Sequence, residues 1–246
     1  MSVWGKVIGG VAGFALGGPI GAIVGAVAGH AVDKIRAEGS EARLEPPTAT
    51  RQVAFSVAVV TLAAKMAKAD GAVTRAEIDA FKRIFHIPPK DMKTVARIFD
   101  EAKRDASGFE PYAQQIAIMF HRDRAVLEEL LAGLFHIAQA DGAVHPAEMQ
   151  YLRRVAAIFG LETSSFERVR AATTGTQEVD PYTILGVARQ ASDEEVKRVY
   201  RRLSRENHPD ALIAKGVPQE FVDKATERMA AINTAYDEVA KQRGLK

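Results

Sequence analysis

Residues 180–210 read DPYTILGVARQASDEEVKRVYRRLSRENHPD and carry the clearest fold signal of the chain. Tyr182 and Leu185 share one side of a short helix that Gly186 ends, because glycine readily adopts the left-handed conformation found after a helix C-terminus. Ser192 is followed by three acidic residues, a pattern typical of a helix start. The stretch therefore predicts two helices joined by a short turn.

The second of these helices, expected to run to about Asn207, has an apolar and a basic side. The residues expected to face inward repeat at helical spacing: Val196, Val199, Tyr200 and Leu203. The other side, here named the basic face, carries five basic residues: Lys197, Arg198, Arg201, Arg202 and Arg205. Such a run is usually a solvated surface. Aromatic residues that would stack on bases are lacking, so nucleic acid is not expected as a partner.

The tripeptide His208-Pro209-Asp210, here named the HPD tripeptide, follows the basic helix. Proline ends a helix and fixes the backbone, while His and Asp stay exposed and polar. A second long helix is expected over residues 219–240, with these residues at helical spacing: Phe221, Ala225, Met229, Ile232, Tyr236 and Val239. The sequence therefore predicts a hairpin of two antiparallel helices with the tripeptide in a projecting loop.

Residues 180–246 resemble the J-domain of DnaJ-like proteins. The resemblance is carried by the opening Asp-Pro-Tyr-x-x-Leu-Gly-Val, the basic face, the HPD tripeptide and the late Ile-Asn-x-Ala-Tyr at 232–236. It implies a co-chaperone whose basic face docks on a DnaK-type chaperone and whose His208, Pro209 and Asp210 trigger ATP hydrolysis there. Ala211 stands where the family often has lysine, which implies weaker docking with the trigger retained.

Residues 52–172 predict an all-helical domain. Apolar residues recur there at three- and four-residue spacing: Val57, Val60, Leu62 and Met66, then Leu127, Leu130, Leu131, Leu134 and Phe135. AKADGAVTRAE at 67–77 returns as AQADGAVHPAE at 138–148, so two related helix-turn-helix halves are expected. The two repeated segments resemble those of the TerB-like family, and this resemblance implies a helical bundle and a candidate metal site.

Four carboxylates take equivalent places in the two copies: Asp70, Glu77, Asp141 and Glu148. If the halves pack pseudo-symmetrically, these groups would cluster and hold a hard cation. The better supported interpretation is local, because Thr74 and Glu77 fit a capping box. Pro146 fits a first helical position and Glu148 falls near the third. The full calcium-loop pattern of an EF-hand is missing from both copies. We expect capping and keep metal binding as the alternative.

Residues 1–36 carry the signal of a membrane anchor. Residues 7–32 contain no Asp, Glu, Lys or Arg. At about 1.5 Å per residue, this run is long enough to cross a hydrocarbon core of about 30 Å. Glycine occupies every fourth position, which favours close helix packing in lipid: Gly9, Gly13, Gly17, Gly21, Gly25 and Gly29. We expect a single-pass glycine-zipper transmembrane helix that self-associates as a homodimer, with peripheral insertion or a kink at Pro19 as alternatives.

The order of parts is similar to that of the DjlA-like family of membrane-anchored J-domain proteins. The expected parts are anchor 1–36, linker 37–51, TerB-like domain 52–172, linker 173–179 and J-domain 180–246. The resemblance implies an all-α protein at the bacterial inner membrane, with the bulk of the chain cytoplasmic and clients of unknown identity. The alternative is a metal- or stress-responsive TerB-like binding protein that uses the J-domain only for recruitment.

Composition excludes several other classes of function. A chain of 246 residues with 47% hydrophobic and 26% charged residues suits folded domains rather than disorder. The absence of cysteine excludes a disulfide framework and thiolate chemistry. No nucleophile–base pair, metal triad or phosphate loop has the required spacing, so neither an enzyme nor a cofactor is expected.

Overall fold

The computed structural model describes residues 18–22, 48–70, 91–104, 108–140, 142–174 and 180–245, together with single residues 79, 82, 87 and 89. Every element within these ranges is a helix, as the sequence predicts. The elements are α4 (Thr48–Asp70), α6 (Met92–Arg104), α7 (Glu110–Met119), α8 (Arg124–Ala138), α9 (Pro146–Ile158), α10 (Thr163–Thr174), α11 (Pro181–Leu185), α12 (Asp193–Glu206), α13 (Pro209–Ala214), the 3-10 helix η2 (Gln219–Phe221) and α14 (Val222–Arg243).

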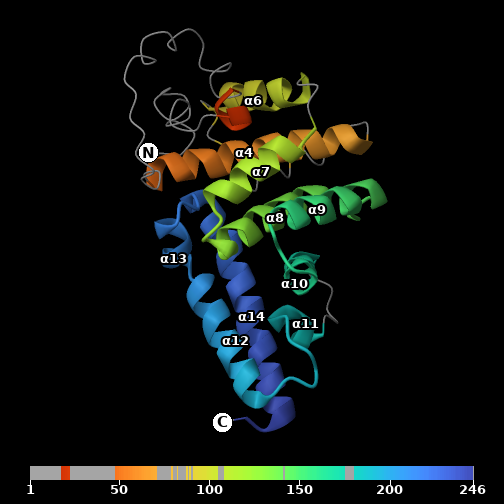
Figure 1. Cartoon of the computed structure of the whole chain (residues 1–246), viewed down its shortest axis with the longest axis vertical. Coiled ribbons are helices and arrows are strands. Elements are labelled where there is room, and N and C mark those ends of the chain that lie inside the picture. Colours follow the sequence, from red (N-terminus) through yellow and green to blue (C-terminus); the bar gives the residue numbers. More distant parts are fainter. Residues whose placement is uncertain are drawn as a thin grey trace.

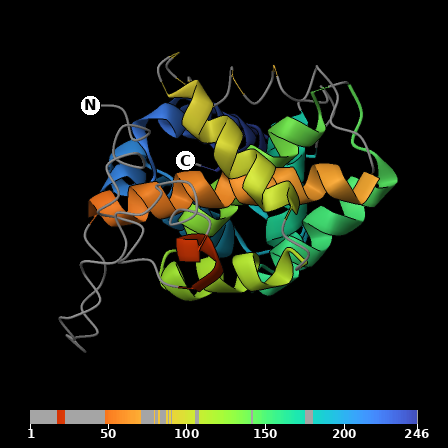
Figure 2. The ribbon, with the colours of Figure 1, turned by 90° about the horizontal axis from the view of Figure 1, so that it is seen from above.

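Helix α4 forms the centre of the middle domain. Every residue from Val53 to Ala67 is buried, and a helix that is mainly apolar all round is stable only when other helices cover it. Helices α6, α7, α8 and α9 all pack against α4. Figure 2 shows α4 crossing the domain with helices on both sides. Tyr151 of α9 donates an O–H hydrogen bond to the backbone carbonyl of Leu62 at 2.8 Å, which ties α9 to the central helix.

The start of α9 shows what the repeated sequence does in its second copy. The backbone N–H of His145 donates to Glu148 Oε2 at 2.8 Å, and the N–H of Ala147 donates to His145 Nδ1 at 3.2 Å. Two N–H groups that lack intrahelical partners are thereby satisfied. This finding confirms the capping role predicted for Glu148. The first copy, from Gly71 onward, lies outside the described residues.

The C-terminal hairpin has a small core of its own. Helices α12 and α14 run antiparallel, with α11 packed on α14 (Figure 1). The buried residues of this core are Tyr182, Leu185, Val196, Leu203, Ile232, Ala235 and Val239. Tyr200 stacks on Tyr236 with ring centroids 3.9 Å apart. Arg243 near the end of α14 donates to the Tyr182 hydroxyl at 2.9 Å and to the Ala191 carbonyl at 2.6 Å, which closes the far end of the hairpin.

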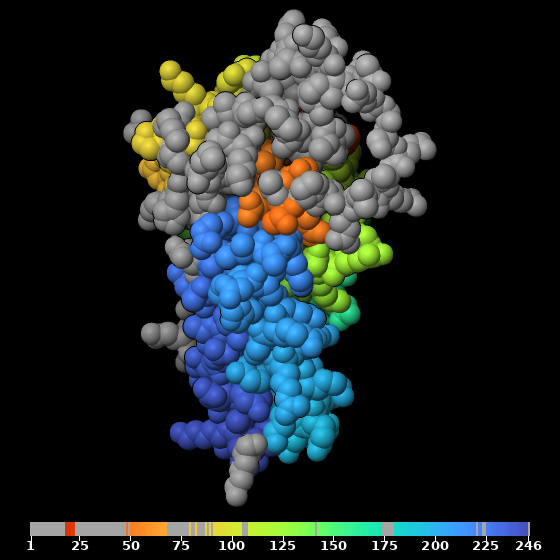
Figure 3. All heavy atoms as spheres, turned by 90° about the vertical axis from the view of Figure 1, so that its left-hand side faces the viewer, coloured from red at the N-terminus to blue at the C-terminus, as the bar shows by residue number. Residues whose placement is uncertain are grey.

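The near end of the hairpin merges with the middle domain. Leu212 of α13, Val217, Phe221 of η2 and Ala225 of α14 belong to the same buried cluster as the residues of α4 and α8. Figures 1 and 3 show α13 and the start of α14 lying directly against α4. The hairpin predicted over residues 180–246 therefore shares part of its core with the middle domain, because these apolar residues are covered there.

The described part of the glycine-rich segment is short. Residues 18–22 are helical, Ile20 is fully buried, and its N–H donates to Gln115 Oε1 at 2.9 Å. Within the described ranges, no helix is both long and apolar enough to cross a membrane. The remaining zipper glycines lie outside those ranges: Gly9, Gly13, Gly17, Gly25 and Gly29. The glycine zipper therefore stays a prediction.

Candidate functional site

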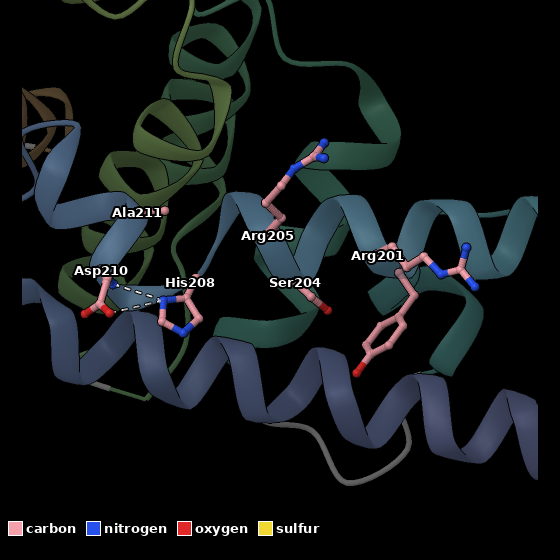
Figure 4. Close-up of a pocket in the computed structure, with 7 residues that line it drawn as sticks. Arg201, Ser204, Arg205, His208, Asp210 and Ala211 are labelled. Atoms are coloured by element: carbon pink, nitrogen blue, oxygen red, sulfur yellow. Dashed lines mark hydrogen bonds and ion pairs between the residues drawn. The ribbon is translucent and has the colours of Figure 1, made fainter.

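His208 connects α12 to α13 and caps α13. Its Nδ1 accepts a hydrogen bond from the backbone N–H of Asp210 at 3.2 Å, and Pro209 begins the helix where no N–H is needed. The side chains of His208 and Asp210 are 59% and 89% exposed and lie side by side (Figure 4). This exposure agrees with the sequence-based expectation. Pro209 and Asp210, however, form the first turn of a helix rather than a free loop, because proline and an acid both suit that turn.

Asn207 fixes the backbone immediately before the HPD tripeptide. It is 2% exposed, and both its backbone N–H and its Nδ2 donate to the carbonyl of Leu203 at 2.9 Å. These two bonds satisfy a carbonyl of the last turn of α12, where intrahelical donors run out. Asn207 Oδ1 accepts a hydrogen bond from Nη2 of Arg228 in α14 at 2.9 Å. The end of α12 is therefore tied to α14 through one buried side chain.

Arg228 extends this connection into the middle domain. Its Nη2 lies 2.6 Å from Oε2 of Glu129 in α8, and both side chains are almost fully buried, at 6% and 2% exposure. Burial raises the pKa of the Glu129 carboxyl; the Arg228 guanidinium opposes this rise, and the neighbouring Glu128 carboxylate adds to it. Glu129 and Arg228 carry no signal of this role in the sequence, because charged residues at helical spacing ordinarily indicate a solvated surface.

The other end of α13 is also attached to the middle domain. Nε of Arg51 in α4 donates to the carbonyl of Lys215 at 2.9 Å. The Arg51 guanidinium also pairs with Asp123, just before α8, and Lys215 Nζ lies 3.8 Å from the same carboxylate. Leu212 in the middle of α13 is fully buried. The segment that carries the HPD tripeptide is thus held at both ends.

The basic face of α12 lies next to the HPD tripeptide. Glu195 lies 4.0 Å from Arg198. The other members of the basic face have no ion-pair partner among the described residues: Lys197, Arg201, Arg202 and Arg205. An open depression of about 640 Å³ is lined by Tyr200, Arg201, Ser204, Arg205, His208, Asp210 and Ala211 (Figure 4). Positive charge without a neutralising partner and the polar HPD side chains thus border one depression, which suits an acidic protein surface.

The candidate metal ligands are described only in part. Glu77, Asp141 and the side chain of Asp70 lie outside the described residues. Glu148 is 3% exposed, and its Oε2 accepts the hydrogen bond from His145. Within the described ranges, no group of three or more His, Asp or Glu side chains is arranged to hold a metal ion. A metal site at these four positions stays a prediction.

Three family models match successive parts of the chain. "Co-chaperone DjlA transmembrane domain" matches residues 1–52, "Tellurite resistance protein TerB" matches 56–171, and "DnaJ domain" matches 180–243. Proteins named "Co-chaperone protein DjlA" are similar over nearly the whole length. Those of Photobacterium profundum and Vibrio cholerae are 30% identical, covering 99% and 100% of this chain and 100% of each relative. That of Coxiella burnetii is 31% identical over 98% of both chains. No solved structure matches the chain significantly.

Proposed function

Because this chain belongs to the DjlA family of co-chaperones, we propose that it stimulates ATP hydrolysis by a DnaK-type chaperone through its HPD tripeptide. The observation that carries the proposal is the joint placement of two features. His208 and Asp210 present exposed polar atoms at the start of α13. The basic face lies beside them on α12, and among the described residues its only ion pair joins Arg198 to Glu195.

The two features take different parts in the proposed action. The guanidinium groups of the basic face attract and orient an acidic surface of the chaperone, and complementary charge of this kind mainly governs encounter and register. The HPD tripeptide then contacts the chaperone with groups whose positions are already fixed. Asn207 holds the backbone before His208, and the hydrogen bond from Asp210 N–H orients the His208 ring. Groups held in place before binding lose little conformational entropy when the complex forms.

His208→Gln tests this proposal, and the chain supplies a matched control. His145 caps α9 in the same way: a proline follows it, and its Nδ1 accepts from the N–H two residues later at 3.2 Å. Each replacement removes a cap worth about 1 kcal/mol. We expect full-length His208→Gln to fold but to lose stimulation of single-turnover ATP hydrolysis by DnaK, while His145→Gln stimulates normally. Normal stimulation by folded His208→Gln protein would contradict the proposed function.

We further propose that residues 1–36 tether the protein to the inner membrane as a single-pass anchor, with the bulk of the chain in the cytoplasm. The match of residues 1–52 to the transmembrane-domain family supports an N-terminal anchor. The four-residue glycine period supports homodimer formation through the anchor, because small residues let helices approach closely in lipid. Lys34 and Arg36 follow the uncharged run and favour a cytoplasmic C-terminal side.

A further inference from the structure

The HPD tripeptide lies on a short segment between two attachments to the middle domain. The first attachment precedes His208 and consists of Asn207, Arg228 and Glu129. The second follows α13 and consists of the Lys215 carbonyl and Arg51. Only residues 208–214 lie between the two attachments. Leu212 in this span is buried in the core that the hairpin shares with the middle domain.

The first attachment is the closer one to the HPD tripeptide. Asn207 adjoins His208 in sequence, and its Oδ1 accepts the hydrogen bond from Arg228. Arg228 is 6% exposed and has its charge partner in the middle domain, where Glu129 Oε2 lies 2.6 Å away. Removing one partner of a buried ion pair leaves the other charge unpaired in the interior, which is strongly unfavourable. Arg228 would then have to move toward solvent and would give up its bond to Asn207.

We propose that Glu129 of the middle domain is a positioning residue for the HPD tripeptide, acting through Arg228 and Asn207. The proposal rests on the function proposed above and adds a role for the TerB-like domain in it. In this role, the middle domain sets the position of His208 and Asp210 relative to the basic face, without touching the chaperone through Glu129. Loss of Glu129 therefore weakens the trigger step and leaves the docking surface of α12 in place.

Glu128 provides a matched control on the same helix. Its Oε1 lies 2.5 Å from Nη2 of Arg168 in α10, and this pair is as deeply buried as the pair of Glu129 and Arg228. Among the described residues, the Glu128 pair has no hydrogen bond to Asn207 or to the HPD tripeptide. Glu128→Gln and Glu129→Gln are thus the same chemical change in adjacent residues, but only Glu129 is connected to the HPD tripeptide through Arg228 and Asn207.

The test compares the two variants in the full-length chain, after circular dichroism has shown that each is folded. In single-turnover hydrolysis by DnaK, we expect Glu129→Gln to lower the maximal stimulated rate about fivefold, with little change in the concentration for half-maximal stimulation. Glu128→Gln should keep the wild-type maximal rate. Hydrogen–deuterium exchange without any chaperone should show faster exchange of residues 208–214 in Glu129→Gln than in Glu128→Gln.

Two outcomes overturn the proposal. The first is that Glu129→Gln and Glu128→Gln reach the same maximal rate while the wild-type protein stimulates DnaK. The second is that residues 208–214 exchange hydrogen for deuterium equally fast in the two variants. If wild type itself fails to stimulate DnaK, the proposed function fails, while the exchange experiment still decides the positioning role. Asn207→Ala serves as a second variant if Glu129→Gln does not fold, because it cuts the link and leaves the ion pair of Glu129 and Arg228 in place. It should also lower the maximal rate, and a wild-type rate would refute the connection.

Discussion

Phe221 packs edge-on against Phe55, with ring centroids 4.7 Å apart and an interplanar angle of 80°. Phe55 belongs to the central helix α4, whereas Phe221 belongs to the segment that matches the DnaJ-domain family. Both rings are almost fully buried. Two parts of the chain that differ in family therefore share one core, and cutting the chain near residue 178 would expose Phe221, Val217 and Leu212 to water.

Phe221→Ala tests how strongly this contact holds the two parts together. We expect the free energy of unfolding to fall by about 3–5 kcal/mol, because a large buried ring is lost and a cavity remains. Chemical denaturation of the full-length chain followed by circular dichroism measures the change. Ile118→Ala is the control, since Ile118 is 74% exposed and its loss should change stability by about 0.5 kcal/mol or less. Equal effects of the two changes would show that Phe221 is not a core residue.

Replacing Arg201 and Arg202 together by Ala should weaken docking on DnaK. The concentration for half-maximal stimulation should rise at low salt, and the difference from wild type should shrink as salt screens the charges. The maximal rate should stay close to that of wild type, because the HPD tripeptide is unchanged. The control is Arg153→Ala with Arg154→Ala on α9, which removes the same charge elsewhere on the surface. A similar loss in the control would mean that net charge, rather than the basic face, governs docking.

Glu148→Gln separates capping from metal binding in the second repeat copy. Gln retains an oxygen that accepts the N–H of His145, so we expect a loss of stability of about 1 kcal/mol or less and normal stimulation of DnaK. Thermal unfolding with and without Mg²⁺, Ca²⁺ or Mn²⁺ should show the same response in the variant, in Glu77→Gln and in wild type. A cation that stabilises wild type but neither variant would instead favour the metal site.

The buried Tyr151 should make the stability of the folded chain depend on pH in the alkaline range. Burial, and secondarily the carboxylate of Glu110, raise the pKa of Tyr151 well above its ordinary value of 10.0. Above that pH the unfolded chain loses this proton while the folded chain keeps it, so Tyr151 makes stability fall as pH rises. Tyr151→Phe should cost about 1 kcal/mol at pH 7, through the lost hydrogen bond to Leu62, and should flatten the alkaline decline. Denaturation curves from pH 7 to above pH 10 measure both effects; identical slopes would contradict them.

The proposed anchor is tested by Gly17→Leu combined with Gly21→Leu. Large side chains on the glycine face should block close helix approach and reduce crosslinking of the protein in membranes. The control is Ala15→Leu combined with Val27→Leu, because each of these positions lies midway between two zipper glycines and therefore on the opposite side of the helix. The control should leave crosslinking unchanged. Unchanged crosslinking of the glycine variant, or recovery of wild type wholly in the soluble fraction, would count against the anchor.

The sequence by itself determined the features that depend on neighbouring residues. The left-handed Gly186, the cap at Ser192 and the capping box at Glu148 could be predicted because each involves hydrogen bonds within a few residues. The position of the HPD tripeptide after a helix with a basic face could be predicted for the same reason, since helical spacing alone places these side chains.

Only the tertiary structure decided what fixes the HPD tripeptide in space. Glu129 and Arg228 are far apart in the sequence, and each is a charged residue of the kind usually found on the solvated side of a helix. Their pairing in the interior depends on how α8 and α14 pack. Phe221 likewise has the spacing of a hairpin core residue but packs on Phe55 of the middle domain. A periodic pattern tells which side of a helix is buried, whereas the partner that buries it is chosen by the packing of distant segments.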